Sequence, residues 1–466
     1  MLKDIRSNPL LLTDAYNLSH QRLKTSTAWE VSHMYNRKEG MILYGFHELV
    51  TTFLADIKVT HEMVDEAIAS AKRMGLIFPE DLWRRVVNEL GGRIPLRVEA
   101  LPEGTYCPAG TPFAQIAHTE EGFGELVTWW EAIFMHAYFP SACATEAFKM
   151  REYLEQRKEE LGADGSFLSR FHSFGFRGHK SLEDAYWAGT AWSLFLKGTD
   201  DFHISKHLPT ADISSIAALA HKVTQQYDDE YLGFLHAIDA TAEVGEKVVA
   251  LVIDTYDAYN VINNMTVTLA NYAHDKGVFL VLRPDSGDTW KQVVDIYDVV
   301  KDNGLDNVGA IIGEGMSLEE AKKADLFFEK NNVPLTFVSY GIGAGFYKDI
   351  DRDTLGWAMK TAYSNHAPRM KFSENPMKRS IPGVVTLVRR GKDLYAGTSS
   401  ETVLEESQYE LIYECYGATT FVKNLDPLEV VQKRAMESDK TQMYIKTTEG
   451  IKNLVKGFKD KYLNKK

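Results

Sequence analysis

The second half of the chain alternates apolar runs with stretches of helical periodicity. Apolar runs rich in β-branched residues occupy residues 247–253, 277–282, 307–312 and 333–338, and each predicts a buried β-strand. The predicted helices between the strands cover residues 259–274, 289–303 and 317–331. This strand–helix unit recurs at about 30 residues, the length of a βαβ unit. Strands that are apolar on both faces indicate a parallel sheet covered by helices on both sides.

Two further apolar segments, residues 166–173 and 191–197, predict strands upstream of these four. Each of the six predicted strands is followed by Gly, Asp or Arg. Parallel strands that alternate with helices and end in such residues are typical of a barrel whose carboxyl-terminal rim carries the chemistry. An open doubly wound sheet would produce the same local pattern, so the sequence alone leaves the closure of the barrel open.

The two ends of the chain have a different pattern. Residues 93–100, 104–108 and 111–118 predict short strands separated by turns that contain Pro and Gly, and strands return at 384–389 and 394–396. We therefore expect an α+β domain built from both chain ends, with an α/β barrel inserted between them. The predicted domains are residues 1–148 with 384–466, and residues 149–383.

The composition narrows the class of protein. Apolar residues make up 44% of the chain and charged residues 25%, which is typical of a globular protein and not of a disordered one. The 52 basic and 65 acidic side chains give a formal charge of −13. A field of that sign repels phosphate backbones and disfavours general binding to nucleic acid, although it permits a local basic pocket.

The first residues and the cysteines predict a cytoplasmic protein. The N-terminal segment lacks the apolar core and cleavage site of a signal peptide, and the longest uncharged stretch, residues 132–145, is too short to span a membrane. The 3 cysteines are far apart and belong to no Cys/His cluster, so we expect reduced, buried thiols and no structural zinc site.

Charged residues follow neighbouring predicted strands. Asp254 and Asp285 would place two carboxylates on one rim, where such a pair binds Mg²⁺, holds ribose hydroxyls or transfers protons. Arg177 and Arg283 also end strands, where a guanidinium can bind a carboxyl, an amide or a phosphate. The alternatives are helix N-caps for the aspartates and salt bridges at the rim for the arginines.

A glycine-rich turn at residues 341–345 follows the last predicted strand, and its backbone N–H groups can bind a phosphate. Such a turn on its own is weak evidence for a phosphate site, because tight turns also need glycine. The basic residues that follow are Arg352, Lys360, Lys371, Lys378 and Arg379. They would add phosphate contacts or simply form a solvated face. Carboxylates, arginines and a phosphate turn on one rim together indicate a sugar-phosphate substrate.

Four short motifs carry a resemblance to a known family. They are Phe174-Gly175-Phe176-Arg177-Gly178, Lys197-Gly198-Thr199-Asp200, Asp254-Thr255-Tyr256-Asp257 and Arg283-Pro284-Asp285-Ser286-Gly287. Together with the segment NPLLLTDAY at residues 8–16, their order and spacing resemble those of the nicotinamide phosphoribosyltransferases, which belong to the type II phosphoribosyltransferases.

The resemblance implies a fold and an activity. The fold would be the irregular α/β barrel of type II phosphoribosyltransferases, with the α+β domain built from both chain ends. The activity would be the transfer of phosphoribose from phosphoribosyl pyrophosphate to nicotinamide, which yields nicotinamide mononucleotide and pyrophosphate in NAD salvage. The resemblance also implies a homodimer with shared active sites and Mg²⁺ bound with the phosphoribosyl pyrophosphate.

The resemblance further assigns roles to residues. The base would lie between Phe174 and Tyr16 of the partner subunit, with Arg283 on the amide oxygen and Asp200 accepting from the amide NH₂. Asp285 and Glu314 would hold the ribose hydroxyls, and the catalytic residues would be Asp254, Asp285 and Arg283. The remaining predicted ribose and phosphate contacts are Arg37, Arg177, Gly313, Gly343, Ala344, Arg352, Lys360 and Lys378.

The chain departs from the family at three positions. The family histidine that ATP phosphorylates corresponds to Ile213, which has no nucleophile, so we expect transfer without ATP-dependent phosphohistidine formation. Glu314 replaces an aspartate, and Ala344 replaces a glycine of the phosphate turn. The nearby histidines His203, His207 and His221 are the alternative acceptors.

Two other functions stay open at this stage. A related phosphoribosyltransferase could use another acceptor base, and a catalytically degenerate homologue could bind the nucleotide without turning it over. The presence of Phe174, Asp200 and Arg283 argues against another base, and the intact motif at residues 283–287 argues against degeneracy.

Overall fold

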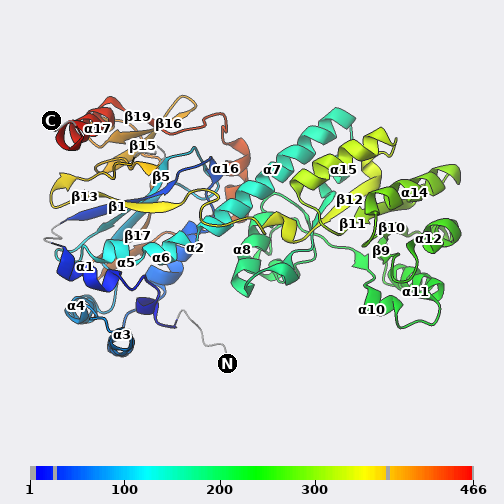
Figure 1. Cartoon of the computed structure of the whole chain (residues 1–466), viewed down its shortest axis with the longest axis horizontal. Helices are drawn as coiled ribbons and strands as arrows, with labels where there is room; N and C mark the ends of the chain where they lie inside the picture. Colours follow the sequence, from blue (N-terminus) through cyan, green and yellow to red (C-terminus); the bar gives the residue numbers. More distant parts are fainter. Residues whose placement is uncertain (1–6, 25–28, 374–377, 464–466) are drawn as a thin grey trace. The chain divides into compact units, whose positions relative to one another are not determined.

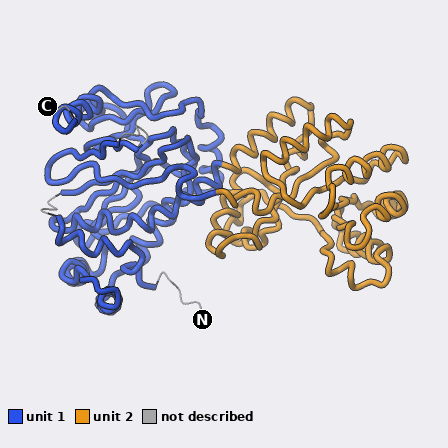
Figure 2. Tube along the Cα trace, in the orientation of Figure 1, with its two compact units in different colours: residues 1–145, 350–466 blue, residues 146–349 orange. Residues whose placement is uncertain are grey.

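The computed structural model describes residues 7–24, 29–373 and 378–463. It contains two compact units, which we call unit 1 and unit 2 (Figure 2). Unit 1 comprises residues 1–145 and 350–466, and unit 2 comprises residues 146–349. Residues 350–383, which we expected in the barrel domain, therefore lie in unit 1. The reason is that β13 (Ala358–Ser364) pairs antiparallel with β1 (Glu30–Asn36).

Unit 2 is built around seven parallel strands in the order β7-β6-β12-β11-β10-β9-β8. The strands are β6 (Phe171–Ser173), β7 (Gly198–Thr199), β8 (Ala217–Ala218), β9 (Val248–Val252), β10 (Phe279–Arg283), β11 (Val308–Ile312) and β12 (Val338–Ile342). The first strand along the chain, β6, pairs with the last, β12, as closure of a barrel requires.

The edge strands β7 and β8 meet through the segment that leads into β8. The backbone N–H of Thr199 donates to the carbonyl of Ser214 at 2.9 Å, and that of Ser214 donates to Lys197 at 2.9 Å. Three residues later, at Ala217, the same segment pairs with β9. These contacts close an irregular barrel, which confirms the predicted fold class and excludes an open doubly wound sheet.

The helices of unit 2 surround these strands (Figure 1). They are α8 (Leu182–Ser193), α9 (Ile204–His207), α10 (His221–Thr224), α11 (Glu230–Glu243), α12 (Ala258–Asn260), α13 (Thr266–Asp275), α14 (Thr289–Asp302) and α15 (Leu318–Lys330). The predicted helices at 289–303 and 317–331 are confirmed by α14 and α15. A π-helical turn, Val261–Met265, divides the predicted helix at 259–274.

One of the six predicted strands was misplaced, and another was predicted too long. Residues 191–197 include the end of α8, and β7 begins only at Gly198. The run reads as a strand because Ala191, Trp192 and the apolar residues after them are almost fully buried, and periodicity cannot separate a buried helix end from a strand. Within residues 166–173, a short 3₁₀ helix, Gly165–Ser169, precedes β6.

A buried ion pair joins three elements of the barrel. The guanidinium of Arg170 donates to both carboxylate oxygens of Asp325, at 2.7 and 3.1 Å, and its Nε donates to the carbonyl of Val338 at 2.7 Å. The side chains of Arg170 and Asp325 are only 4% and 2% exposed. The hydroxyls of Tyr340 and Tyr153 also donate to Asp325. This network connects α15 to β12 and to the residue before β6, where the barrel closes on its first strand.

Unit 1 contains a seven-stranded sheet in the order β14-β13-β1-β5-β3-β17-β18 and a three-stranded sheet in the order β15-β16-β19. Its further strands are β2 (Met41–Ile42), β3 (Leu96–Ala100), β4 (Tyr106–Cys107), β5 (Thr111–His118), β14 (Ala367–Pro368), β15 (Val385–Arg390), β16 (Asp393–Thr398), β17 (Glu410–Tyr416), β18 (Thr419–Val422) and β19 (Lys446–Thr447). All five strands that we predicted near the chain ends have a counterpart here: β3, β4, β5, β15 and β16.

The helices of unit 1 include α1 (Asn17–Leu23), α2 (Phe46–Val50), α3 (His61–Arg73), α4 (Glu80–Leu90), α5 (Leu126–Trp129), α6 (Glu131–Met135), α16 (Leu428–Glu437) and α17 (Glu449–Tyr462). The long helix α7 (Tyr138–Leu161) runs from one unit into the other. Among the described residues, no helix is long and apolar enough to cross a membrane. Cys107, Cys143 and Cys415 are all buried.

The buried pair of Arg170 and Asp325 leads to a stability prediction. Asp325→Ala leaves the guanidinium of Arg170 buried without its carboxylate, and we expect a loss of about 3–5 kcal/mol of unfolding free energy. Urea denaturation followed by circular dichroism measures it. The control is Lys323→Ala on the same helix, which removes an exposed pair with Glu320 and should change the midpoint very little. Equal effects of the two variants would show that the buried network does not stabilise the barrel.

Candidate active site

The predicted rim residues of unit 2 follow the carboxyl ends of its strands. Phe174 follows β6, Asp200 follows β7, Asp254 and Asp285 lie two residues beyond β9 and β10, and Gly313 follows β11. Because all seven strands are parallel, their carboxyl ends lie on the same rim of the barrel. The topology therefore brings together side chains that are more than 100 residues apart in the sequence.

Two glycines make room for the ring of Phe174. A Cβ atom at Gly341 would lie 2.0 Å from Cε2 of Phe174, and a Cβ atom at Gly313 would lie 3.6 Å from the same atom. The Cβ atom at Gly313 would also lie 2.9 Å from Oδ1 of Asp285 and 3.8 Å from Cδ of Arg283. Three side chains thus lie around the backbone of Gly313: the ring of Phe174, the carboxylate of Asp285 and the side chain of Arg283. The ring offers a flat apolar surface, and the other two place a negative and a positive charge at its edge.

Asp200 is held by two hydrogen-bond partners. Its Oδ1 lies 2.9 Å from Nε2 of His172 and accepts from the hydroxyl of Ser215 at 2.6 Å. Burial alone would raise the pKa of Asp200, but these hydrogen bonds and the charges of His172 and Arg283 lower it below its ordinary value. Because both bonds use Oδ1, an ionised Oδ2 stays free to accept from a ligand NH group.

Arg283 lies beside Asp200 at the end of β10. One of its terminal nitrogens donates to the carbonyl of Leu219 at 3.3 Å. Its Nε is buried and has no hydrogen-bond partner among the residues that the structure describes. A positive donor next to a negative acceptor can recognise a group that carries both an acceptor and a donor, such as a carboxamide.

Asp254 and Asp285 face a histidine. Nε2 of His221 lies 3.5 Å from Oδ2 of Asp285 and 3.9 Å from Oδ1 of Asp254, and its Nδ1 lies 3.0 Å from the hydroxyl of Thr255. The side chain of Asp254 is only 7% exposed; Ser286 donates to its Oδ2, while Oδ1 is without a hydrogen-bond partner in the described part of the chain. The N-cap role that we weighed for Asp254 and Asp285 is therefore not the one observed, because Asp257 and Asp288 cap the following helices.

The phosphate turn has one strict requirement for glycine. A Cβ atom at Gly345 would lie 2.0 Å from the carbonyl oxygen of Met316, so no larger residue fits there. Ala344, in contrast, begins a short 3₁₀ helix with negative φ and needs no glycine. This departure from the family therefore costs no backbone strain. Arg177 and Glu314 are exposed on the loops that follow β6 and β11.

The other predicted phosphate contacts lie in unit 1. Burial lowers the pKa of Lys360, and so do the charges of Arg37, Lys371 and Arg352, while Glu131 opposes them. Burial and the charge of Arg352 likewise lower the pKa of Arg37. The four cations Lys360, Arg37, Lys371 and Arg352 form a strongly positive region. A bound anion would reduce the repulsion between their charges. Lys378 is exposed and shows no contact that assigns it to this region.

Tyr16 also lies in unit 1, beside a pocket that includes His20, Glu131 and Lys360. Partial burial and a hydrogen bond to Asp14 raise the pKa of Tyr16 to about 12, so its hydroxyl stays protonated at neutral pH. The ring is 58% exposed, and an exposed aromatic ring can contact a ligand or another subunit.

Ile213 lies between two anchored residues of the loop at residues 209–215. Asp212 pairs with Lys197, and Ser214 pairs with β7. Of the three candidate histidines, His221 faces Asp254 and Asp285. His203 packs against Phe176, and the ring of His207 lies 4.9 Å from that of Tyr186.

Sequence reasoning missed three residues of the rim, His172, Asp201 and Ser215, and it named His221 only as an alternative phosphoryl acceptor. The carboxylate of Asp201 is 3% exposed and accepts from the hydroxyl of Ser173 and the N–H of Phe176, which fixes the turn that carries Phe174. The available signal for His172 and Asp201 was position, because each is adjacent to a recognised motif. No local pattern marks Ser215 or His221.

Comparison with solved structures gives the class of protein. The chain aligns with human nicotinic acid phosphoribosyltransferase over 96% of its length and 99% of that chain, with a TM-score of 0.65 and 15% identity. It aligns with nicotinate-nucleotide pyrophosphorylase from Pyrococcus furiosus over 94% of this chain and 96% of that one, with a TM-score of 0.62 and 15% identity. The fold is that of the type II phosphoribosyltransferases.

Sequence comparison shows which proteins the chain is similar to. Residues 169–371 match the nicotinate phosphoribosyltransferase family, and residues 8–98 match the N-terminal domain of nicotinamide phosphoribosyltransferase. The nicotinamide phosphoribosyltransferase of Xanthomonas campestris is 26% identical over 433 residues, which are 86% of this chain and 91% of that one. The one from Acinetobacter baylyi is 23% identical over 87% of this chain and 93% of that one. The chain is thus similar to nicotinamide phosphoribosyltransferases over most of its length.

The contacts of Asp200 lead to a prediction for its ionisation. His172→Ala removes a hydrogen bond and a charge that favour the carboxylate, while burial remains, so we expect the pKa of Asp200 to rise. Carboxyl-¹³C NMR titration of labelled aspartates measures it, with Asp200→Asn to assign the signal. The control His274→Ala removes an exposed histidine at the end of α13 and should not move this signal. An unshifted titration in His172→Ala would contradict the assignment.

Proposed function

We propose that this chain transfers phosphoribose from phosphoribosyl pyrophosphate to the ring nitrogen of nicotinamide, which gives nicotinamide mononucleotide and pyrophosphate. The observation that carries the proposal is the pair of Asp200 and Arg283 beside the ring of Phe174. An ionised Asp200 accepts from an amide NH₂ and Arg283 donates to the amide oxygen. A nicotinate carboxylate would instead meet the negative charge of Asp200.

The rest of the rim supports the transfer step. Stacking on Phe174 orients the flat base, and the aromatic face also favours the cationic pyridinium product. Asp285 and Glu314 are the proposed partners of the ribose hydroxyls, and Asp254 orients this assembly. Carboxylates near the ribose also stabilise the positive charge that develops as pyrophosphate leaves.

Mg²⁺ is the proposed companion of phosphoribosyl pyrophosphate. The described residues contain no group of three His, Cys, Asp or Glu side chains that could hold a metal ion. They do offer the partnerless oxygen of Asp254 with Asp285 nearby, and Mg²⁺ is typically bound by one or two carboxylates together with substrate phosphates. When bound, Mg²⁺ neutralises the charge of the leaving pyrophosphate.

We further propose a cytoplasmic homodimer with shared active sites. The base site in unit 2 has one aromatic wall, Phe174, and the exposed ring of Tyr16 of the partner subunit would supply the second. The cations Arg37, Arg352, Lys360 and Lys378, with Arg177, would hold the phosphates. The buried cysteines support a reducing compartment.

The decisive experiment supplies phosphoribosyl pyrophosphate, Mg²⁺ and nicotinamide to the purified protein without ATP. Because the base, ribose and phosphate contacts do not involve residue 213, we expect nicotinamide mononucleotide to accumulate, detected by liquid chromatography, and Asp285→Ala to abolish it. Product with another base in place of nicotinamide would favour the related transferase. Saturable binding without any product would favour the degenerate homologue.

An ATP arm of the same experiment tests the coupling. An isoleucine cannot accept a phosphoryl group, so γ-labelled ATP should leave no acid-labile phosphate on the protein and should not raise its affinity for phosphoribosyl pyrophosphate. Stoichiometric labelling that disappears in His221→Gln, but not in His203→Gln or His207→Gln, would contradict this and show that the rim histidine accepts phosphate.

Asp200 is expected to set the preference for the amide over the acid. Asp200→Asn removes the charge that repels nicotinate, and the ratio of kcat/KM values for the two bases should narrow by about 10–100-fold, which is about 1.4–2.7 kcal/mol. The control Asp212→Asn removes an exposed charge from the neighbouring loop and should leave the ratio unchanged. An unchanged ratio in Asp200→Asn would mean that the carboxylate does not face the substituent.

Complementation tests the shared site. Tyr16→Ala and Asp285→Ala should each be inactive as homodimers, whereas mixed chains should recover roughly a quarter of wild-type activity, because half of the dimers are hybrids with one intact site. The control is the double variant Tyr16→Ala/Asp285→Ala mixed with itself, which has no intact site. If differently tagged subunits exchange and activity does not return, Tyr16 does not act across the interface.

A further inference from the structure

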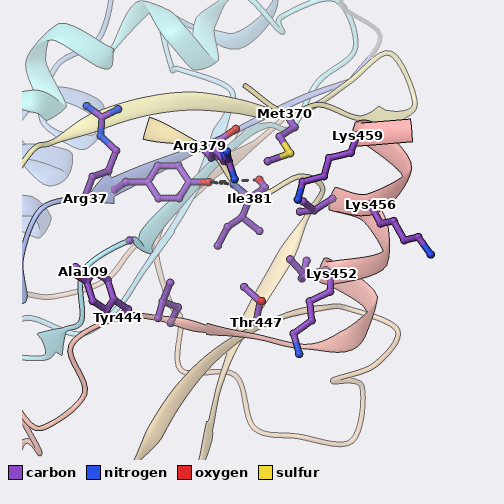
Figure 3. A pocket seen from close by; sticks show the side chains of 16 residues that line it. Arg37, Ala109, Met370, Arg379, Ile381, Tyr444, Thr447, Lys452, Lys456 and Lys459 are labelled. Atoms are coloured by element: carbon purple, nitrogen blue, oxygen red, sulfur yellow. Dashed lines mark hydrogen bonds between the residues drawn. The ribbon is translucent and has the colours of Figure 1, made fainter. Parts of the chain in front are cut away.

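A second cavity lies in unit 1, and none of its lining residues belongs to the barrel rim described above. Its volume is about 470 Å³, within the range of small-molecule sites. We call it the α17 pocket, because one face of α17 forms a wall. The remaining walls come from Tyr35 and Arg37 at the end of β1, from residues 379–381, and from residues 444–447 around β19 (Figure 3).

The α17 pocket is lined by both positively charged and apolar side chains. Its cations are Arg37, Arg379, Lys452, Lys456 and Lys459, and no carboxylate is among its lining residues in the described part of the chain. A local excess of five cations is the opposite of what a chain with a net charge of −13 would produce on average. Ligand sites of this size combine apolar walls with a few placed charges.

Figure 3 shows how these side chains are arranged. Lys459 and Arg379 reach toward the same part of the cavity, next to Met370 and Ile381, whereas the amine of Lys456 extends away from it. The hydroxyl of Tyr35 accepts from the N–H of Ile381 at 3.0 Å, which fixes the aromatic wall. Tyr444, with its ring 52% exposed, supplies a second aromatic surface.

The two arginines of the pocket, Arg379 and Arg37, are each held by a hydrogen bond from Nε to a backbone carbonyl. Nε of Arg379 donates to the carbonyl of Ser373 at 3.1 Å, and Nε of Arg37 donates to the carbonyl of Gly356 at 2.8 Å. An anchored guanidinium loses less side-chain entropy on binding, and its two terminal nitrogens match the oxygens of a phosphate. Since the nearby Arg352 already lowers the pKa of Arg37, the local potential favours an anion.

We propose that the α17 pocket binds a phosphorylated small molecule with an aromatic ring, of the nucleotide class. Its phosphates would contact Arg379 and Lys459, and its ring would lie against Tyr35 or Tyr444. The proposal goes beyond phosphoribosyl transfer, because the lysines of α17 have no assigned part in that reaction. Two other lining residues do: Arg37 is assigned to the substrate phosphates, and Arg379 is one of the basic residues that the sequence offers as further phosphate contacts.

Isothermal titration of the full-length protein with ADP, in 0.15 M salt, tests the site. Lys459→Glu should weaken ADP binding by about tenfold, the equivalent of about 1.4 kcal/mol. The matched control is Lys461→Glu, which makes the same charge change on the same helix but outside the pocket, and should bind ADP like the wild type. Thermal unfolding of both variants checks that the helix remains folded.

Titrations with two other ligands and with a rim variant distinguish the possible binding sites and binding modes. Adenosine lacks the phosphates and tripolyphosphate lacks the ring, so each should bind more weakly than ADP; equal affinity for either would overturn the proposal. The variant Arg177→Ala separates this site from the barrel rim. If Arg177→Ala abolishes ADP binding and Lys459→Glu does not, ADP binds at the rim and the α17 pocket is not its site. An unaltered affinity in Lys459→Glu would overturn the proposal by itself.

Discussion

Closure of the barrel by residues 214–221 is the constraint on which the candidate site depends. Ser214 pairs with β7, and the N–H of Leu219 donates to the carbonyl of Ala250 in β9. The same few residues also complete the rim: Ser215 donates to Asp200, the carbonyl of Leu219 accepts from Arg283, and His221 faces Asp254 and Asp285. A single segment therefore closes the barrel and positions the groups for base recognition. A shift of this segment would disturb both at once, and none of these contacts is made by the side chain of Ile213.

Charge is distributed between the two units in opposite senses. The rim of unit 2 places Asp200, Asp254 and Asp285 close together, with Arg283 and His221 between them. In unit 1, burial and the charges of Arg37, Lys371 and Arg352 lower the pKa of Lys360, and Glu131 only partly compensates for them. Ribose hydroxyls and a developing positive charge suit the first environment, and phosphates suit the second. Phosphoribosyl pyrophosphate, the proposed substrate, carries both ribose hydroxyls and phosphates, and its sugar gains positive charge as pyrophosphate leaves.

The parts of the fold that the sequence predicted are those with long, uniform signals. β9 to β12 and the helices α14 and α15 have apolar periods that span a whole element, and packing reinforces them. The misjudged parts are short or ambiguous: β7 and β8 have two residues each, and the buried end of α8 looks like a strand. Residues 350–383 were misplaced because β13 pairs with β1, more than 300 residues away, and no local pattern marks such a pairing.

The same reasoning explains which site residues could be foreseen. Phe174 and Asp200 directly follow strands, Arg283 ends β10, and Asp285 lies two residues beyond it, so the strand pattern itself placed them on one rim. His172, Ser215 and His221 act through partners that are 28, 15 and 34 residues away, and such contacts exist only once the barrel has closed. These supporting residues contact the carboxylates of the site and hold them in place. Because His172 and Ser215 both occupy Oδ1 of Asp200, they determine which oxygen is left for the ligand, and specificity thereby depends on residues that do not contact it.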